Sequence, residues 1–427
     1  MIERKFPHSY TFAQNSELMA QILFILIIAF VVIEFLLARF LDFLNEKKRS
    51  PDLPKEAEGI YDEEKYRKSQ DYEKANHKVS VIGSWLNIVL ILAVLLLGGF
   101  AWLDQFVRGF TEHPVLMALF FFGILSFASG IVGLPFGVYS TFVIEEKFGF
   151  NKMTPKLYVL DKIKNILLSA ILGGGILSLV IFIYQWTGEW FWLIAWATVA
   201  AITIFFTMFY TSFIVPIFNK LTPLEDGDLR KSIERYAEKV GFSLKNIFVI
   251  DGSKRSSKAN AYFSGFGAKK SIVLYDTLIK DHTTEEITAV LAHEVGHYQK
   301  KHIIKSMAIS VLQMGVLFFV FGWLVDNPLL ANVLSAEENS FHLALVTFAL
   351  LYSPISLVIG LLMNAYSRKN EFEADAYAKE TYAASPLKDA LKGLAVNHLS
   401  NLTPHPAYVF FYYSHPPLLQ RLGALER

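Results

Sequence analysis

Long stretches without charge are the feature that most constrains how this chain can fold. A helix needs about 20 apolar residues to cross the hydrocarbon core of a bilayer, since each residue advances it by 1.5 Å. Seven stretches of the 427-residue chain are long enough, and five of them contain no Asp, Glu, Lys or Arg. They cover residues 18–41, 79–103, 114–144, 165–188, 190–218, 304–325 and 343–366. The sequence therefore predicts an all-α, multi-pass membrane protein with seven transmembrane helices.

The overall composition excludes several other classes of protein. Hydrophobic residues make up 53% of the chain and charged residues 19%, whereas soluble domains are about one quarter charged. The net charge of +1 does not favour a nucleic-acid partner. The chain has no cysteine, which excludes disulfides, thiolate metal ligands, a cysteine nucleophile and lipids attached through sulfur.

The distribution of Lys and Arg between the stretches predicts an orientation in the membrane. The segments 42–78, 145–164, 219–302 and 367–427 together hold 35 basic residues, and the alternate segments hold three. Basic residues are enriched on the cytosolic side of membrane proteins. We therefore expect the N-terminus outside, and the large polar segments and the C-terminus in the cytosol.

The larger polar segment, 219–302, has the pattern of a small α+β unit. A helix is predicted over 229–240, and three short apolar stretches after it predict an antiparallel sheet with strands at 247–250, 261–263 and 271–275. A further helix should begin at Thr283, because Thr283 and Glu286 have the spacing of a capping box.

That helix carries the sequence His293-Glu294-Val295-Gly296-His297. Residues four apart lie on one face of a helix, so both imidazoles can bind one metal ion. Glu294 follows the first histidine and is suited to take a proton from a metal-bound water. The alternative is a pair of surface histidines on a charged helix end. Gly296 is costly inside a helix and indicates a close approach of another segment.

A catalytic zinc ion needs a third protein ligand and an open position for water. The sixth and seventh stretches form a transmembrane hairpin, which returns the chain after residue 366 to the level of His293. The acidic residues of the far loop would lie roughly 30 Å away. Glu371 is therefore the expected third ligand, and Asp375, one turn later, is expected to accept the free ring N–H of a ligand histidine. Glu373 should point elsewhere. One Zn²⁺ per chain is predicted.

These elements divide the chain into four parts. We expect a five-span membrane region with its cytosolic loops at 1–218 and a cytosolic metalloprotease segment with the zinc-binding helix at 219–302. A transmembrane hairpin should follow at 303–366, and a cytosolic tail with the third zinc ligand at 367–427.

Three segments, HEVGHYQKKH, SRKNEFEADAYAKE and YYSHPPLLQRL, resemble the integral-membrane zinc endopeptidases of the type I CAAX prenyl protease family. The segment 260–265 is also similar. The resemblance implies a barrel of seven helices around a large aqueous chamber. It implies that Asn260, Ala261 and Tyr262 form an edge strand that pairs with the substrate backbone. It further implies that His415 and Arg421 lie over the metal and assist the tetrahedral intermediate or bind a substrate carboxylate.

The same resemblance sets the expected partners and location. The partners are the lipid bilayer and a peptide or protein substrate, prenylated or not, and a monomer is expected. The family's activity would be hydrolysis near the cytosolic face, where its members remove the C-terminal tripeptide of prenylated proteins. The short loop 326–340 favours a bacterial-type member in the inner membrane, and the endoplasmic reticulum is the alternative for a eukaryote.

Other functions remain as alternatives. A quality-control zinc endopeptidase of the heat-shock type shares the metal motif, but such chains have fewer spans. An intramembrane protease of the site-2 type would carry the motif inside a span. The non-enzyme alternative is a transporter or scaffold with a vestigial metal site, for which a charged residue such as Glu34 inside a span would be typical.

Overall fold

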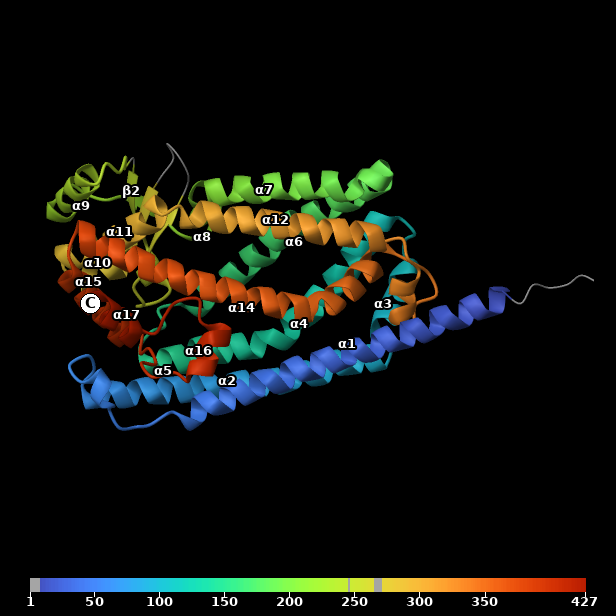
Figure 1. The fold of residues 1–427 in the computed structure, drawn as a ribbon, viewed down its shortest axis with the longest axis horizontal. Helices are drawn as coiled ribbons and strands as arrows, with labels where there is room; N and C mark the ends of the chain where they lie inside the picture. The colour runs from blue at the N-terminus through green and yellow to red at the C-terminus, as the bar shows by residue number, and fades with distance from the viewer. Residues whose placement is uncertain (1–7, 245, 265–270) are drawn as a thin grey trace, which may run out of the picture.

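The computed structural model describes residues 8–244, 246–264 and 271–427. Figure 1 shows long helices running side by side, with a small α+β unit at one end. The long helices are α1 (His8–Lys47), α2 (Glu63–Leu96), α4 (Pro114–Tyr139), α6 (Pro155–Thr187), α7 (Phe191–Phe213), α12 (His302–Leu324) and α14 (Phe341–Thr381). Shorter helices connect them: α3 (Gly99–Arg108), α5 (Glu146–Phe148), α8 (Val215–Phe218) and α13 (Leu329–Val333).

Six stretches of the described chain are long and apolar enough to cross a membrane. One of them, Pro155–Phe218, contains α6 and α7 in succession, separated by a short turn at Gly188–Trp190. The predicted fourth and fifth spans therefore lie within a single apolar stretch. The other predicted spans correspond to α1, α2, α4, α12 and α14.

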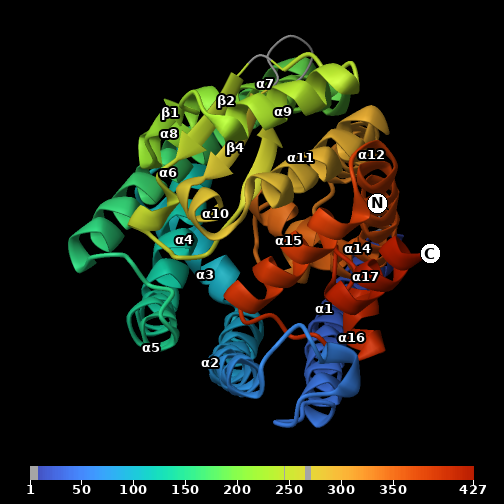
Figure 2. The same ribbon diagram turned by 90° about the vertical axis from the view of Figure 1, so that its left-hand side faces the viewer.

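The long helices pack in a ring. Contacts run in a closed order from α1 through α2, α3, α4, α6, α7, α12 and α14 back to α1. Figure 2 shows this arrangement end-on. In an 18-residue apolar segment of each stretch, only 6–17% of the residues are buried, because each helix packs mainly against its two neighbours. This single layer of apolar helices agrees with the multi-pass membrane fold that the sequence predicts.

The second span ends earlier than predicted. It was expected over 79–103, but α2 ends at Leu96 and the separate helix α3 begins at Gly99. Gly98 between them has a φ of 66°, which is favourable for glycine alone. The break lets α3 bury Phe100 and Val107 against the ring.

The α+β unit contains a sheet and the surrounding helices. Its strands are β1 (Leu221–Pro223), β2 (Asn246–Ile250), β3 (Ala261–Ser264) and β4 (Ser271–Tyr275), in the order β1-β2-β4-β3. Its helices are α9 (Asp228–Lys239), α10 (Asp276–Asp281), α11 (Thr284–Gln299), α15 (Ala384–Asn397) and α17 (Leu418–Glu426). The short helix α16 (Pro406–Tyr412) packs against α1 and α14.

The sheet differs from the predicted antiparallel one. β3 and β4 are antiparallel, as are β1 and β2, but β2 and β4 are parallel. The reason is that β3 lies on the far side of β4, at the edge, so that β4 returns alongside β2. β1 was not predicted, since three residues carry no periodic signal. Gly265 of the predicted edge segment lies outside the described residues.

The two predicted helices of this unit are confirmed. α9 ends one residue before the predicted end, and α11 begins directly after Thr283 with both bonds of the capping box present. The apolar side of α11, including Ile287, Leu291 and Val295, packs into the core of the unit. The capping box and this apolar face together determine the position of the helix.

Arg255 joins the α+β unit to the membrane helices. Its Nε and Nη2 donate to the two carboxylate oxygens of Asp161 on α6, at 2.7 and 3.0 Å. Nη2 also donates to the carbonyl oxygen of Phe218 at 2.7 Å. Asp161 is buried, so the loss of its partner would leave a buried charge unpaired.

We expect Arg255→Ala to destabilise the protein by about 1–3 kcal/mol, because the buried carboxylate of Asp161 loses its donors. Thermal unfolding of the purified protein in detergent measures this change. Arg230→Ala is the matched control, since Arg230 makes exposed ion pairs with Asp226 and Glu234. Equal melting temperatures for the two variants would contradict the proposed importance of this contact.

Candidate metal centre

The length of α14 is what carries acidic residues to the site. Its 41 residues make a helix of about 60 Å, roughly twice the thickness of the hydrocarbon core. The last turns therefore extend past the membrane and pack against α11. This part of α14 buries Glu371 and Asp375, which are 4% and 1% exposed, on the face that meets α11.

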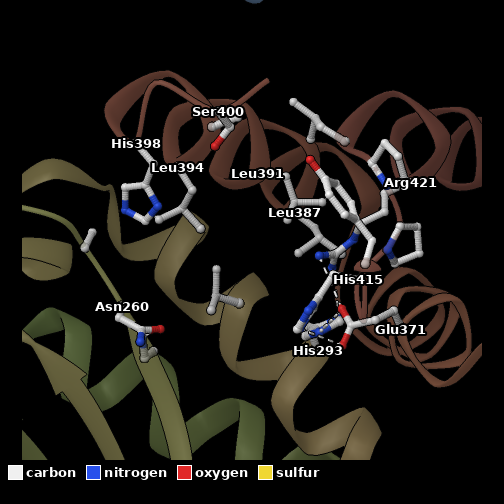
Figure 3. Close-up of a pocket in the computed structure, with 18 of the residues that line it drawn as sticks. Asn260, His293, Glu371, Leu387, Leu391, Leu394, His398, Ser400, His415 and Arg421 are labelled. Atoms are coloured by element: carbon white, nitrogen blue, oxygen red, sulfur yellow. Dashed lines mark hydrogen bonds and ion pairs between the residues drawn. The ribbon is translucent and has the colours of Figure 1, made fainter. Parts of the chain in front are cut away.

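The predicted ligands come together at this contact. One ligand atom from each of His293, His297 and Glu371 can be chosen so that all lie within 4.8 Å of one another. The Nε2 atoms of the two histidines are 3.1 Å apart. Glu371 places Oε2 3.5 Å from Nε2 of His293 and Oε1 3.3 Å from Nε2 of His297. Figure 3 shows His293 and Glu371 facing each other across the helix contact.

This donor set fits a zinc ion. Two imidazole nitrogens and one carboxylate oxygen are the ligands of a common class of catalytic zinc site. Among the described residues, Glu371 Oε2 is buried and accepts no hydrogen bond. The Nε2 atoms of the two histidines, 3.1 Å apart, can both direct a lone pair at one cation.

Asp375 lies where the sequence predicts it. Its Oδ1 is 2.8 Å from Nδ1 of His293, so the ring N–H of that histidine can donate to it. This bond leaves the lone pair of His293 Nε2 directed toward Glu371 and His297.

Arg421, on α17, binds Asp375 with two parallel hydrogen bonds, from Nε at 2.8 Å and from Nη2 at 2.6 Å. Its Nη1 lies 3.4 Å from Glu371 Oε2. Burial alone would lower the pKa of Arg421, but Asp375 and Glu371 raise it above its ordinary value. Arg421 therefore stays charged and neutralises the two buried carboxylates.

His415 lies at the open side of the site. Its side chain is 66% exposed, and its Nε2 is 3.3 Å from Glu371 Oε1. Figure 3 shows His415 and Arg421 on the same side of the site, close to Glu371. His415 can thus reach a molecule bound next to the metal, whereas most of the polar atoms of Arg421 already have protein partners.

A glycine allows the two helices to approach closely. A Cβ atom at Gly296 would lie 3.1 Å from both the Cα and the carbonyl oxygen of Ala374, and 3.2 Å from Cβ of Tyr377. These distances are tighter than ordinary van der Waals contact. The close approach that the sequence indicated at Gly296 is therefore the contact between α11 and α14.

A cavity of about 760 Å³ opens beside the site. Glu294, half-buried, lines it together with the three ligand residues. α15 contributes an apolar row, and the end of the cavity away from the metal is polar (Figure 3). At that end, burial and then the charge of Lys258 lower the pKa of His398 below its ordinary value, so its imidazole is neutral near pH 7.

The three edge-strand residues divide between two cavities. Asn260 and Ala261 line the cavity beside the metal ligands. The side chain of Tyr262 instead lines a separate cavity of about 550 Å³ next to α6 and α7, because alternate side chains of a strand point to opposite faces. Burial raises the pKa of Tyr262 to about 12.

Two residues near the site were not assigned a role from the sequence. They are His302 and Glu373. The Nδ1 atoms of His297 and His302 are 3.0 Å apart, and Nε2 of His302 lies 3.0 Å from Oε2 of Glu373. Glu373 is not among the three ligand residues, and it reaches His297 only through the ring of His302. The spacing of five between His297 and His302 gives no shared helical face. They meet because the chain turns at Lys301, where φ is 58°.

Comparison with known proteins identifies relatives along nearly the whole chain. The model described as "CAAX prenyl protease N-terminal, five membrane helices" matches residues 42–220, and that of peptidase family M48 matches residues 223–427. CAAX prenyl protease 1 of Saccharomyces cerevisiae is 37% identical, with 94% of this chain and 95% of the relative covered. The homologue from Homo sapiens is 31% identical, with 89% and 90% covered.

The fold also matches a solved structure. The crystal structure of Ste24p from S. mikatae superposes with a TM-score of 0.89 at 37% sequence identity. The match covers 95% of this chain and 99% of that chain. The likeness therefore includes both the membrane helices and the α+β unit.

We expect Asp375→Asn to weaken zinc binding by about 10–100-fold, because it removes the charge that orients His293 and pairs with Arg421. Competition with a chromophoric chelator measures the dissociation constant. Glu380→Gln, an exposed acid on the same helix, is the control. Unchanged zinc affinity in Asp375→Asn would show that Asp375 has no effect on metal binding.

Gly296→Val should destabilise the protein by about 1–3 kcal/mol and weaken zinc binding, because the added side chain forces α11 and α14 apart. Thermal unfolding in detergent and chelator competition measure the two effects. Gly423→Val on α17 is the comparison, because a Cβ there has open space around it. An equal response of both glycines would contradict the role of close packing.

Proposed function

Because the chain belongs to the CAAX prenyl protease family and carries a peptidase family M48 domain, we propose that it hydrolyses peptide bonds with a zinc ion held by His293, His297 and Glu371. That it is a membrane protease follows from the family itself. The observation that carries the assignment of the site is the convergence of these three ligand atoms within 4.8 Å at the contact of α11 and α14. One ion per chain is expected.

A zinc ion bound there would lower the pKa of a water ligand and polarise the scissile carbonyl. Glu294 precedes His297 by three residues and lines the cavity, so its carboxylate can take the proton of the attacking water. The same carboxylate can then deliver the proton to the leaving amine. Glu294 is therefore proposed as the general base and acid.

His415 is proposed to contact the substrate. His415 lies beside Glu371, yet its side chain is 66% exposed. Its ring N–H can therefore donate to the substrate oxygen that becomes negative during attack. Arg421 is held against Asp375 by two hydrogen bonds, and this favours a role in holding the ligand network over a direct grip on a substrate carboxylate.

β3 is proposed to bind the substrate backbone. It stands at the edge of the sheet order and Ala261 lines the metal cavity, so an extended peptide could add to its free side. Asn260, Ala261 and Tyr262 would then pair through their backbones, while the side chain of Tyr262 packs away from the substrate. The named relatives are prenyl proteases, and we extend prenylated peptides to this chain as the expected substrate class.

The site is proposed to face the cytosol. α9, α11, α15 and the C-terminus lie at one end of the long helices, and the described start of α1 lies at the other (Figure 1). The segments at the first end include those that hold 35 basic residues. The positive-inside rule supports an N-terminus outside and a C-terminus in the cytosol.

The expected oligomeric state, a monomer, stays a prediction. The choice of membrane, for which the short loop 326–340 favours the bacterial inner membrane, stays a prediction. The alternative of a heat-shock type protease is disfavoured because the prenyl protease model covers residues 42–220.

Glu294→Gln should retain zinc but lower kcat by about 10²–10⁴-fold, because the amide cannot accept the proton of water. Peptide cleavage and metal content, both measured on one preparation, give the two quantities. Glu285→Gln, an exposed acid in the first turn of the same helix, should cleave normally. Normal turnover by Glu294→Gln would exclude the proposed mechanism.

A farnesylated peptide should be cleaved several-fold faster than the same peptide without the lipid, and a zinc chelator should stop both reactions. Cleavage products are quantified by mass spectrometry. Equal rates for the two peptides would reject lipid-directed specificity while leaving the peptidase assignment intact. Cleavage that persists after complete removal of metal would reject the zinc site.

A further inference from the structure

The two ligand histidines are supported by different partners. Behind His293, the carboxylate of Asp375 lies directly against Nδ1 at 2.8 Å. Behind His297, the group at Nδ1 is the imidazole of His302, at 3.0 Å. His302 in turn contacts Glu373 Oε2 through its other ring nitrogen, at 3.0 Å. The second ligand therefore reaches its carboxylate through an intervening ring.

When a metal is bound, the hydrogen bonds from His297 through His302 to Glu373 can run in only one direction. A metal ion on Nε2 of His297 leaves the proton of that ring on Nδ1. That N–H must donate to Nδ1 of His302, which then has to be an acceptor. The proton of His302 consequently sits on Nε2, where it donates to the carboxylate of Glu373. Both ring nitrogens of His302 then have a hydrogen-bond partner.

The surroundings hold His302 in this orientation. The residue is 3% exposed, so water does not compete for its ring nitrogens. It is the first residue of α12, directly after Lys301 with its left-handed φ of 58°, and that turn points the ring back toward α11. Glu373 is 37% exposed and its other oxygen lies 3.7 Å from Lys369. That exposed ion pair contributes little compared with the bond to His302.

We propose that His302 and Glu373 are positioning residues that set the tautomer and ring orientation of His297 for metal binding. The inference rests on the proposed zinc site and deepens it. It also links that site to the membrane, because His302 begins α12 and Glu373 lies on the extension of α14. Both transmembrane helices of the last hairpin thus contribute to the orientation of one ligand.

Zinc dissociation constants of purified variants, measured by competition with a chromophoric chelator, test the proposal. His302→Leu should raise the dissociation constant by about 10–100-fold, the range for loss of an outer-shell partner of a metal ligand. Glu373→Gln, which keeps a neutral acceptor, should have a smaller effect. His302→Asn keeps an amide oxygen close to the position of Nδ1 and should recover part of the affinity.

Matched controls separate this effect from general damage. His113→Leu replaces an exposed histidine at a distant loop, and Glu380→Gln replaces an exposed acid on α14. Both should bind zinc as the unaltered protein does. The visible spectrum of the Co²⁺-loaded protein, which reports ligand geometry, should change in His302→Leu and stay the same in both controls.

Two results would overturn the proposal: a dissociation constant of His302→Leu within twofold of the unaltered protein, or a loss that His302→Asn does not recover at all. The second result would assign the effect to packing. Failure of the zinc site itself would look different, because the unaltered protein and His293→Ala would then bind zinc equally. Tight binding by the unaltered protein, lost in His293→Ala and unchanged in His302→Leu, would reject the positioning role alone.

Discussion

The packing of α11 against the end of α14 is the contact on which the site depends. The two histidines lie on one helix and Glu371 on the other, and a complete transmembrane hairpin separates them in the chain. Gly296 lets the backbones approach until an added Cβ would lie 3.1 Å from Ala374. Metal sites tolerate errors of only about 0.2 Å in ligand distance. The spacing of these helices is therefore a condition for metal binding as well as for stability.

Buried charge explains why the end of the chain folds back onto this contact. Glu371 and Asp375 are almost completely buried, and two carboxylates removed from water are costly without a cationic partner. Arg421 supplies it from α17, with two hydrogen bonds to Asp375 and one nitrogen near Glu371. His415 precedes α17 and is brought to the open side of the site by the same segment. The electrostatic requirement and the placement of His415, the proposed substrate contact, thus have one structural origin.

The membrane helices and the metal motif could be predicted because their signals are local. Long apolar stretches indicate membrane spans directly, and the capping box predicts the start of α11. The hairpin between spans six and seven indicates that Glu371 and Asp375 lie near the histidines. The predicted antiparallel sheet was wrong for β2 and β4, since strand order depends on long-range pairing. The break at Gly98 was missed because the sequence on both sides of it is equally apolar.

By itself, the sequence determined that the chain crosses the membrane repeatedly and carries two histidines and a carboxylate on faces that can share an ion. These follow from hydrophobicity and helical periodicity, which act between near neighbours. Only the tertiary structure decided that Arg421 binds Asp375 and that Glu373 reaches His297 through His302. Such contacts join three or more segments, and they depend on a left-handed turn at Lys301 and on the register of α14 against α11. No periodic pattern in the sequence predicts that turn or that register.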